Sequence, residues 1–211
     1  DIVIGAPQNW SGFHAPVPGY ARVYSGADFS LLWEFVGDAA TWVDGPDDHF
    51  GHAVDTAGDV DLDGHADLFI GAFKDDGPGV NSGEIRVYSG ATGALLYAVD
   101  GLGGDHLGYT LAHMGDLNGD GYPDLLSGSL KNDQNGMNCG RADIFSGRDG
   151  QRLYFRLGDV QGDALGTSVA RLPDLDSDGV DDWIAGATQY GLAGRAGYAR
   201  LYSGASGTLL D

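Results

Sequence analysis

The hydrophobic residues of this chain fall in short runs separated by glycine, aspartate and serine. Some runs are almost continuously apolar, such as Leu68-Phe69-Ile70-Gly71-Ala72, which predicts a strand buried on both faces. Others alternate, with Ile85 and Val87 set against Arg86 and Tyr88, which predicts a strand whose two faces differ. Glycine supplies 37 of 211 residues without a triplet period, so many tight turns are expected. The pattern predicts an all-β protein.

Four landmarks recur in the same order with a period of about 57 residues. The first is an aromatic or aliphatic residue followed by glycine, and the second is an acidic loop. An apolar run closing on glycine and a small residue comes third, and an alternating strand ending in aromatic-Ser-Gly comes last. The first landmark is Phe50-Gly51, Leu107-Gly108 and Leu165-Gly166, and the last is Tyr24-Ser25-Gly26, Tyr88-Ser89-Gly90, Phe145-Ser146-Gly147 and Tyr202-Ser203-Gly204.

Each unit reads as four short strands separated by turn residues. The expected strands are 51–58, 67–72, 84–89 and 94–99 in the second unit, 109–115, 124–129, 141–146 and 151–156 in the third, and 167–173, 182–187, 197–203 and 207 onward in the fourth. Four strands on such a period predict the antiparallel blades of a β-propeller, with an internally duplicated sandwich as the alternative.

The chain is therefore expected to form a single partial propeller domain over residues 1–211. Its blades are predicted at about 1–36, which is incomplete, 50–100, 107–157, and 165–211, which is also incomplete. A closed propeller has about four to eight blades, and this chain supplies about 3.5. We expect it to be a fragment of a longer gene product or a piece of a larger ring.

The acidic loops carry oxygen-bearing side chains at positions 1, 3, 5 and 9 in all three units. Calcium takes about six to eight oxygen ligands, and acids at alternate positions turn their carboxylates toward one point. Glycine at position 6 permits the sharp bend, and the backbone carbonyl of position 7 is expected to point inward. The candidate ligands are Asp59, Asp61, Asp63, His65 and Asp67 in the first loop, Asp116, Asn118, Asp120, Tyr122 and Asp124 in the second, and Asp174, Asp176, Asp178, Val180 and Asp182 in the third.

These loops differ from an EF-hand, which needs a bidentate Glu at position 12 on an exiting helix. Position 12 here is Ile70, Ser127 or Ala185, and the acid at position 9 opens a β-strand. The alternative is an Asp-Gly turn whose acids serve solubility. Three loops at one place in a repeat favour Ca²⁺, because clustered carboxylates repel one another unless a cation lies among them. Asp1 aligns with position 9 and predicts a fourth, truncated site.

Charge and cysteine content exclude several classes of partner. The formal net charge of −20 repels phosphate backbones, so nucleic acid is not expected as a partner. The single cysteine, Cys139, excludes an internal disulfide and a multi-cysteine metal site. No apolar stretch approaches the ~18 residues needed to span a bilayer, so no membrane insertion is expected within this segment.

An enzymatic role is not expected. The histidines show no His-x-x-x-His pair, and the chain has neither a Gly-x-Ser-x-Gly elbow nor a Walker-type phosphate loop. His49 and His106 both precede the aromatic/aliphatic-Gly landmark, which makes them repeat positions. Paired acids are also used by glycosidases, but a catalytic site is normally single, whereas these acids recur in each blade.

These landmarks resemble the FG-GAP repeats of the integrin α-subunit propeller and its bacterial relatives. The resemblance rests on Phe50-Gly51, the three acidic loops, and the endings at Gly5-Ala6, Gly71-Ala72 and Gly186-Ala187. Pro7 follows Gly5-Ala6, so the Gly-Ala-Pro sequence for which the repeat is named is complete once. Leu107 and Leu165 replace Phe, and Gly128-Ser129 replaces Gly-Ala. The resemblance implies a seven-bladed propeller with calcium loops on one face and ligand contacts on the opposite face. Nothing aligns with the inserted adhesion domain of integrins, so that activity is not implied.

On this chain the opposite face would comprise the loops at about 7–19, 73–82, 130–139 and 188–196 and the connections at about 37–49, 100–106 and 158–164. Two of these segments hold Trp10, Phe13, His14, Trp42 and His49, which either bind carbohydrate or a protein partner or pack between blades. We expect a calcium-stabilised adhesion or recognition module, extracellular or at the cell surface. The alternative is a non-catalytic accessory propeller of a secreted hydrolase, such as a phospholipase or polysaccharide-degrading enzyme.

Overall fold

The computed structural model describes residues 1–7, 18–38, 48–189 and 195–210, and it is all-β within them. Its strands form four antiparallel sheets, in each of which chain neighbours pair. The first sheet contains β1 (Ile2–Ala6), β2 (Tyr20–Tyr24) and β3 (Leu31–Val36). The second contains β4 (Ala53–Gly58), β5 (Asp67–Ala72), β6 (Glu84–Tyr88) and β7 (Leu95–Asp100). The third contains β8 (Thr110–His113), β9 (Leu125–Ser129), β10 (Arg141–Phe145) and β11 (Arg152–Leu157), and the fourth contains β12 (Leu165–Arg171), β13 (Trp183–Ala187) and β14 (Tyr198–Tyr202).

The structure confirms the strands predicted in the second and third units to within a few residues at their ends. The segment predicted as a strand from residue 207 onward is represented by its first pairing with β14. In the described residues that segment makes one isolated bridge, between Tyr202 and Leu209, and one hydrogen bond from the Leu210 N–H to the Leu201 carbonyl (2.9 Å). The bridge has the register in which Tyr88 pairs with Leu95, the residue that opens β7 in the second sheet.

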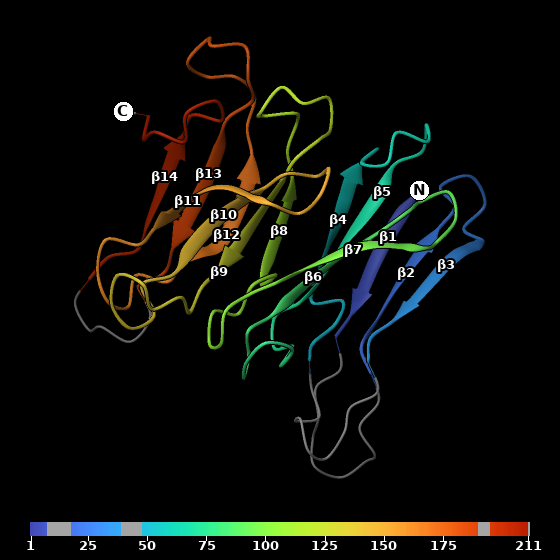
Figure 1. Ribbon diagram of the computed structural model, residues 1–211, viewed down its shortest axis with the longest axis horizontal. Helices are drawn as coiled ribbons and strands as arrows, with labels where there is room; N and C mark the ends of the chain where they lie inside the picture. Colours follow the sequence, from blue (N-terminus) through green and yellow to red (C-terminus); the bar gives the residue numbers. More distant parts are fainter. Residues whose placement is uncertain (8–17, 39–47, 190–194, 211) are drawn as a thin grey trace.

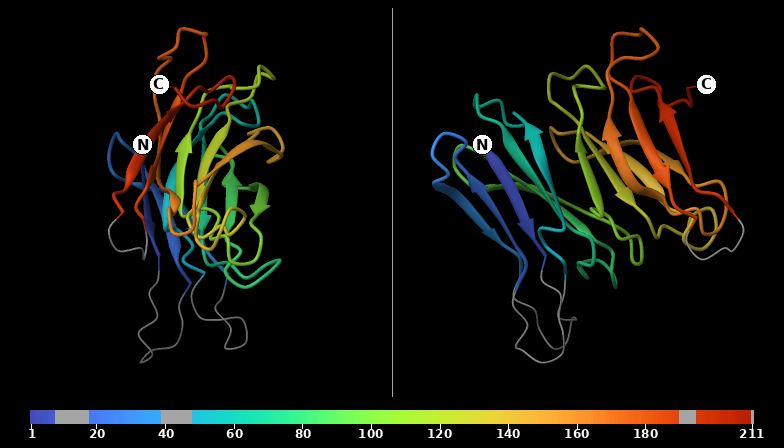
Figure 2. Two further views of the ribbon diagram at one scale, coloured as in Figure 1. Left: turned by 90° about the vertical axis from the view of Figure 1, so that its left-hand side faces the viewer. Right: turned by 180° about the vertical axis from the view of Figure 1, so that it is seen from behind.

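The four sheets lie face to face in chain order and spread like a fan, with the first sheet at one side of the molecule and the fourth at the other (Figure 1). The view from behind shows the same order (Figure 2). This arrangement of antiparallel sheets confirms the predicted fold class, a partial β-propeller. The division into blades at residues 1–36, 50–100, 107–157 and 165–211 remains a prediction. Among the described residues, no helix has the length and hydropathy needed to cross a membrane.

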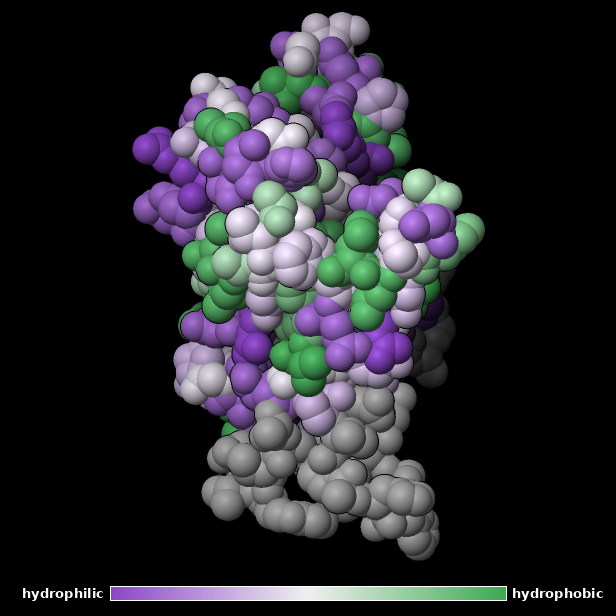
Figure 3. Space-filling model, turned by 90° about the vertical axis from the view of Figure 1, so that its right-hand side faces the viewer, coloured by the Kyte–Doolittle hydropathy of each residue, from purple (hydrophilic) through white to green (hydrophobic). Residues whose placement is uncertain are grey.

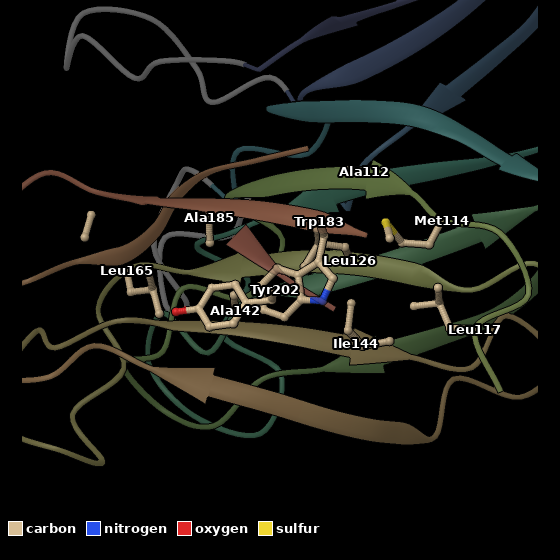
Figure 4. Close-up of a cluster of buried hydrophobic side chains, with 11 residues drawn as sticks. Ala112, Met114, Leu117, Leu126, Ala142, Ile144, Leu165, Trp183, Ala185 and Tyr202 are labelled. Atoms are coloured by element: carbon tan, nitrogen blue, oxygen red, sulfur yellow. The ribbon is translucent and has the colours of Figure 1, made fainter. Parts of the chain in front are cut away.

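The hydrophobic core is divided into three clusters, one between each pair of neighbouring sheets. Between the third and fourth sheets, Trp183 stacks on Tyr202 with ring centroids 4.3 Å apart, and Leu126 and Ile144 belong to the same cluster (Figure 4). The two middle sheets therefore have apolar contacts on both faces. That is why β5 and β9 are buried at every residue.

The aromatic/aliphatic-Gly landmark joins each sheet to the one before it. Phe50, Leu107 and Leu165 are fully buried at these junctions. A Cβ atom on Gly71 would lie 2.2 Å from the carbonyl oxygen of Gly108, so only glycine lets the two backbones approach this closely. The same holds for Gly5 against Gly51 and for Gly128 against Gly166, at 2.0 and 1.9 Å. The glycine that closes the apolar run of one unit and the glycine of the aromatic/aliphatic-Gly landmark of the next unit thus form one contact between neighbouring sheets.

Candidate metal centre

The three acidic loops lead from β4 into β5, from β8 into β9 and from β12 into β13, at one end of the sheets (upper end in Figure 1). The acid at position 9 is fully buried in each loop: Asp67, Asp124 and Asp182 are 0% exposed. One of its carboxylate oxygens accepts the backbone N–H of position 2, and the other accepts the N–H of the glycine in aromatic-Ser-Gly. The donors are Val60 (2.8 Å) and Gly90 (2.9 Å), Leu117 (2.9 Å) and Gly147 (3.2 Å), and Leu175 (2.7 Å) and Gly204 (3.0 Å).

This contact explains the glycine of the aromatic-Ser-Gly landmark, a role that sequence reasoning missed. A Cβ atom on Gly90 would lie 1.9 Å from the carbonyl oxygen of Ala66, and one on Gly147 would lie 1.7 Å from that of Pro123. A larger residue would push the third strand away from the loop. The signal in the sequence was the nearly constant separation of 22 or 23 residues between the position-9 acid and this glycine.

The acid at position 1 organises the turn. Asp59, Asp116 and Asp174 each accept the N–H of position 5 with one carboxylate oxygen and that of the glycine at position 6 with the other, at 2.8–3.2 Å. Position 4 has a left-handed backbone in every loop, with φ of 60° at Leu62, 76° at Gly119 and 65° at Ser177. Three different residues therefore adopt one turn.

Positions 3 and 5 point in different directions. Asp61, Asn118 and Asp176 at position 3 accept the N–H of position 5 at 3.1, 2.8 and 3.2 Å. The acids at position 5 instead accept the N–H of position 7, at 2.9 Å for Asp63, 3.0 Å for Asp120 and 2.9 Å for Asp178. The position-5 carboxylates are thus turned toward the exit of the loop.

Two loops bring three carboxylates together. Asp59, Asp61 and Asp67 each offer one oxygen atom, and these atoms lie within 4.8 Å of one another; Asp174, Asp176 and Asp182 do the same. Calcium–oxygen bonds are about 2.3–2.6 Å long, so one cation can contact all three oxygens of such a group. In the second loop Asn118 offers an amide oxygen in place of the acid, so of the described residues only the first and third loops form a group of three acids. These donors are all hard oxygens and fit a hard divalent cation.

Burial acts against the charged form of Asp67 and Asp124. It raises the pKa of the Asp67 carboxyl, and it raises the pKa of Asp124 to about 6, although backbone N–H groups act in the opposite direction on both. The nearby Asp116 and Asp120 also raise the pKa of Asp124. A bound cation would favour the charged carboxylates, because it replaces repulsion among them with attraction.

The structure thus brings positions 1, 3 and 9 together, while the acids at position 5 and the carbonyls of His65, Tyr122 and Val180 remain predicted ligands. Asp1 accepts the N–H of Gly26 at 2.9 Å. This is the bond that Asp67 makes to Gly90, so Asp1 occupies the place of a position-9 acid in the first sheet.

A second repeated acid lies at the other end of the sheets, and sequence reasoning missed it. Asp48, Asp105 and Asp163 each stand two residues before the aromatic/aliphatic-Gly landmark. The residue that follows each acid has a left-handed backbone, with φ of 56° at His49, 59° at His106 and 52° at Ala164. The recurring Asp-x-aromatic/aliphatic-Gly pattern was the available signal.

The side-chain partners of Asp105 and Asp163 differ. Asp105 accepts hydrogen bonds from Asn132 (2.9 Å) and from the buried Arg141 (3.0 Å), and Arg141 also pairs with Asp143 (2.8 Å). Asp163 accepts hydrogen bonds from the Gln189 side chain (2.6 Å) and the Tyr198 hydroxyl (2.9 Å).

Asp48 lies among other acids. Burial and the negative charges of Asp75, Asp38 and Asp76 together raise the pKa of its carboxyl to about 6, although Arg86 acts in the opposite direction. Burial also raises the pKa of Glu84 to about 7, even though Glu84 is paired with Arg86 (2.5 Å). This part of the opposite end is therefore short of positive charge.

Aromatic and histidine rings gather at the same end. Phe73 contacts the rings of His49, His52, His106 and Tyr109, with centroids 4.6–5.3 Å apart. Burial lowers the pKa of His106 to about 4, and Lys131 and Lys74 add to this effect. Of the residues predicted to bind a ligand here, Trp10, Phe13, His14 and Trp42 lie outside the described residues.

Comparison with known proteins agrees with the landmarks. The FG-GAP-like repeat family matches residues 59–127, which include the first two acidic loops. Integrin α-5 of Xenopus laevis is 29% identical over 206 residues, covering 89% of this chain, and integrin α-6 of Gallus gallus is 31% identical over 137 residues, covering 62%. The predicted resemblance is confirmed: residues 59–127 match the FG-GAP-like repeat family, and the chain is similar to integrin α-chains. It spans only 18% and 12% of the length of these two relatives.

Two solved structures of enzymes also align with the chain. A rhamnogalacturonan lyase of Bacillus licheniformis aligns with a TM-score of 0.43 and 12% identity over 96% of this chain and 43% of its own. The exotype rhamnogalacturonan lyase YesX gives the same TM-score with 14% identity, over 99% and 36%.

Proposed function

We propose that this chain is a calcium-stabilised segment of an extracellular or cell-surface propeller, and that it acts as an adhesion or recognition module without catalytic activity of its own. The observation that carries the proposal is the recurrence of one loop geometry in three successive units, with the same hydrogen bonds around Asp59, Asp116 and Asp174. A catalytic site has no reason to recur in this way. A structural cation site does, because each sheet needs the same loop.

Calcium would be held by positions 1, 3 and 9, with the position-5 acids and the position-7 carbonyls as the further predicted ligands. Bound there, it would neutralise the carboxylates and fix each loop against the strand that follows. Extracellular calcium sites commonly have dissociation constants of about 10⁻⁴–10⁻³ M. At about one hundred times that concentration, each site would add about 2.7 kcal/mol to the free energy of unfolding.

Thermal unfolding of the purified chain tests the calcium sites. We expect excess chelator to lower the melting temperature, calcium to restore it, and magnesium at equal concentration not to restore it. The double variant Asp59→Asn/Asp61→Asn should lose part of the calcium response. Asp149→Asn is the matched control, because Asp149 is an acid in an exposed turn and accepts a local hydrogen bond from Gln151 (3.0 Å). A melting temperature that is the same in chelator and in calcium would disprove the calcium sites.

We propose that the ligand is a protein or a carbohydrate and that it contacts the end of the sheets opposite the acidic loops. The similarity to integrin α-chains supports this choice, as does the contrast between identical loops at one end and individual residues at the other. Binding of the calcium-loaded chain to arrays of glycans and of extracellular-matrix proteins tests it. If the chain binds neither class while its calcium response is intact, the recognition role is refuted and the calcium proposal stands.

A further inference from the structure

Both lysines of the sequence lie at the end of the sheets opposite the acidic loops. Lys74 follows β5 and Lys131 follows β9, and Gln189 holds the same place after β13. Their backbones are equivalent, because the N–H of each donates to the carbonyl of the acid that stands two residues before the aromatic/aliphatic-Gly landmark, at 3.1–3.4 Å. The two lysines thus occupy one repeat position in neighbouring sheets.

Neither lysine forms an ion pair with a residue that the structure describes. In the fourth unit, by contrast, the Gln189 side chain donates a hydrogen bond to Asp163 at 2.6 Å. The sequence has 31 acids and 11 lysines and arginines, so acidic partners are abundant. Two ammonium groups that remain unpaired among them can attract an anion from outside the chain.

Both lysines lie close to the same imidazole ring. The Lys74 ammonium group is 5.8 Å from the centre of the Phe73 ring, and the His106 ring is 5.3 Å from that centre. Burial lowers the pKa of His106 to about 4, and the positive charges of Lys131 and Lys74 contribute to the lowering. We call Lys74, His106 and Lys131 the basic cluster.

The fold does not require the basic cluster. The fourth unit has Ala164 at the place of His106 and Gln189 at the place of Lys131, and the backbone is the same there, with φ of 52° at Ala164 and 59° at His106. His106 is 6% exposed, and its Nδ1 atom has no hydrogen-bond partner among the described residues. An unpaired buried polar atom lowers stability, as does repulsion between like charges. Residues that oppose folding where neutral ones suffice indicate a binding role.

The basic cluster lies where the second and third sheets meet. Each of these sheets packs on a neighbour at both faces. Lys74 and Lys131 are nevertheless partly exposed, because they follow the ends of β5 and β9. A ligand would therefore reach them from the end of the sheets.

Acidic residues limit the size of the anion. Asp76 stands two residues after Lys74, and Asp133 stands two residues after Lys131. Charges act over about 8 Å at physiological ionic strength, so an acidic polysaccharide with a charge on successive sugars would also meet these acids. A protein can present one carboxylate by itself. In the view of Figure 3, hydrophilic residues lie between the apolar middle of the first sheet and this end, which suits a polar contact.

We propose that Lys74, His106 and Lys131 form a site for the carboxylate of an aspartate or glutamate side chain on a protein partner. The proposal rests on the recognition role proposed above and specifies the chemistry of one contact within it. A carboxylate between the two ammonium groups would replace their mutual repulsion with attraction. In a chain with a net charge of −20, such a site selects one acid at a defined place.

A nuclear magnetic resonance titration of the calcium-loaded, ¹⁵N-labelled chain tests the site. The probe is a pentapeptide with acetylated and amidated ends that carries a single Asp between glycines, and the same peptide with Asn is its control. We expect the Asp peptide to shift the amide signals of His106 and Lys131 saturably, with a dissociation constant of about 10 mM or below. The Asn peptide should leave them in place.

Lys74→Gln and Lys131→Gln introduce the residue that the fourth unit has at this position, so the fold tolerates them. Each should weaken binding of the Asp peptide about fivefold, and the double variant should abolish the shifts. The melting temperature should not fall, because no described residue loses an ion pair. Arg148→Gln is the matched control: it removes an exposed positive charge near Tyr122 of the second acidic loop, at the other end. It should leave binding unchanged.

Three results would overturn the site. They are the absence of saturable shifts, equal shifts with the Asp and Asn peptides, and a double variant that binds like the unchanged chain. Tighter binding of trigalacturonate than of the Asp peptide at the same signals would overturn the choice of a protein ligand. A chain that binds matrix proteins on the arrays but not the Asp peptide keeps the recognition role and loses this site, so the two failures are distinguishable.

Discussion

At the end of the sheets that carries the acidic loops, Asp67, Asp124 and Asp182 make the same two hydrogen bonds in three units. At the other end Asp48, Asp105 and Asp163 also occupy one repeat position, and their backbone carbonyls accept equivalent N–H groups. The side chains that bind Asp105 and Asp163, however, are different. The difference shows that the two ends respond to different constraints. Backbone N–H groups recur in every unit and keep the loop end uniform, whereas side-chain partners vary from unit to unit.

The largest effect on stability is expected when an acid is removed at the end of the sheets opposite the acidic loops. Asp105→Ala should cost about 3–5 kcal/mol of unfolding free energy, because it takes a partner from Arg141, which is only 2% exposed. Urea unfolding at pH 7 measures the loss. Asp105→Asn, which keeps the shape and an acceptor, should cost less. A loss under about 1 kcal/mol for the alanine variant would mean that Asp143 alone satisfies Arg141.

The next largest effect is expected when the position-9 acid of an acidic loop is removed. Asp67→Ala and Asp182→Ala each leave two backbone N–H groups without their acceptor, so each should cost about 2–3 kcal/mol in calcium-free buffer. The two losses should agree to within about 1 kcal/mol, since the bonds are the same. Parallel urea titrations of the two variants measure them. Clearly unequal losses would show that the loops are equivalent in geometry but not in energy.

The effect of Asp48 on the stability of the protein should depend on pH. The pKa of Asp48 is raised to about 6 in the fold, above its value of about 3.9 in an unfolded chain. The folded state therefore binds more protons between these values, and the contribution of Asp48 to stability is lost as pH rises through about 6. Asp48→Asn should stabilise the protein by about 1 kcal/mol at pH 8 and have little effect at pH 4. If the gain is equal at both pH values, the charge of Asp48 is not its cause.

The smallest effect on stability is expected at position 4 of the acidic loops, where the three loops carry different residues. Leu62 adopts the left-handed backbone that Gly119 adopts in the second loop, and its side chain is exposed. Leu62→Gly should therefore be neutral or stabilise the protein by up to about 1 kcal/mol, because relief of backbone strain opposes the greater entropy of glycine in the unfolded chain. Ala66→Gly, outside the strained position, is the control and should not stabilise. Thermal melts in chelator distinguish the two.

Much of the fold could be predicted because its signals are local. The continuous run at Leu68-Phe69-Ile70 and the alternation around Arg86 each specify a strand within a few residues, and the repeat multiplies that evidence. Which residue pairs with which, as Leu209 with Tyr202, depends on the neighbouring strand, and local pattern does not reveal it. In the metal centre, positions 1, 3 and 9 converge, but the turn of the Asp63, Asp120 and Asp178 carboxylates toward position 7 follows from backbone geometry that spacing alone does not specify.

By itself, the sequence determined the all-β class, the four-landmark repeat and the three acidic loops, since each depends on residue type and short spacing. Only the tertiary structure decided what the landmarks do. Gly71 and Gly108 are brought together by the stacking of sheets, and Asp67 and Gly90 by the pairing of strands within one sheet. The sequence shows a glycine or an aspartate at each of these positions, but it does not show which distant residue is its partner.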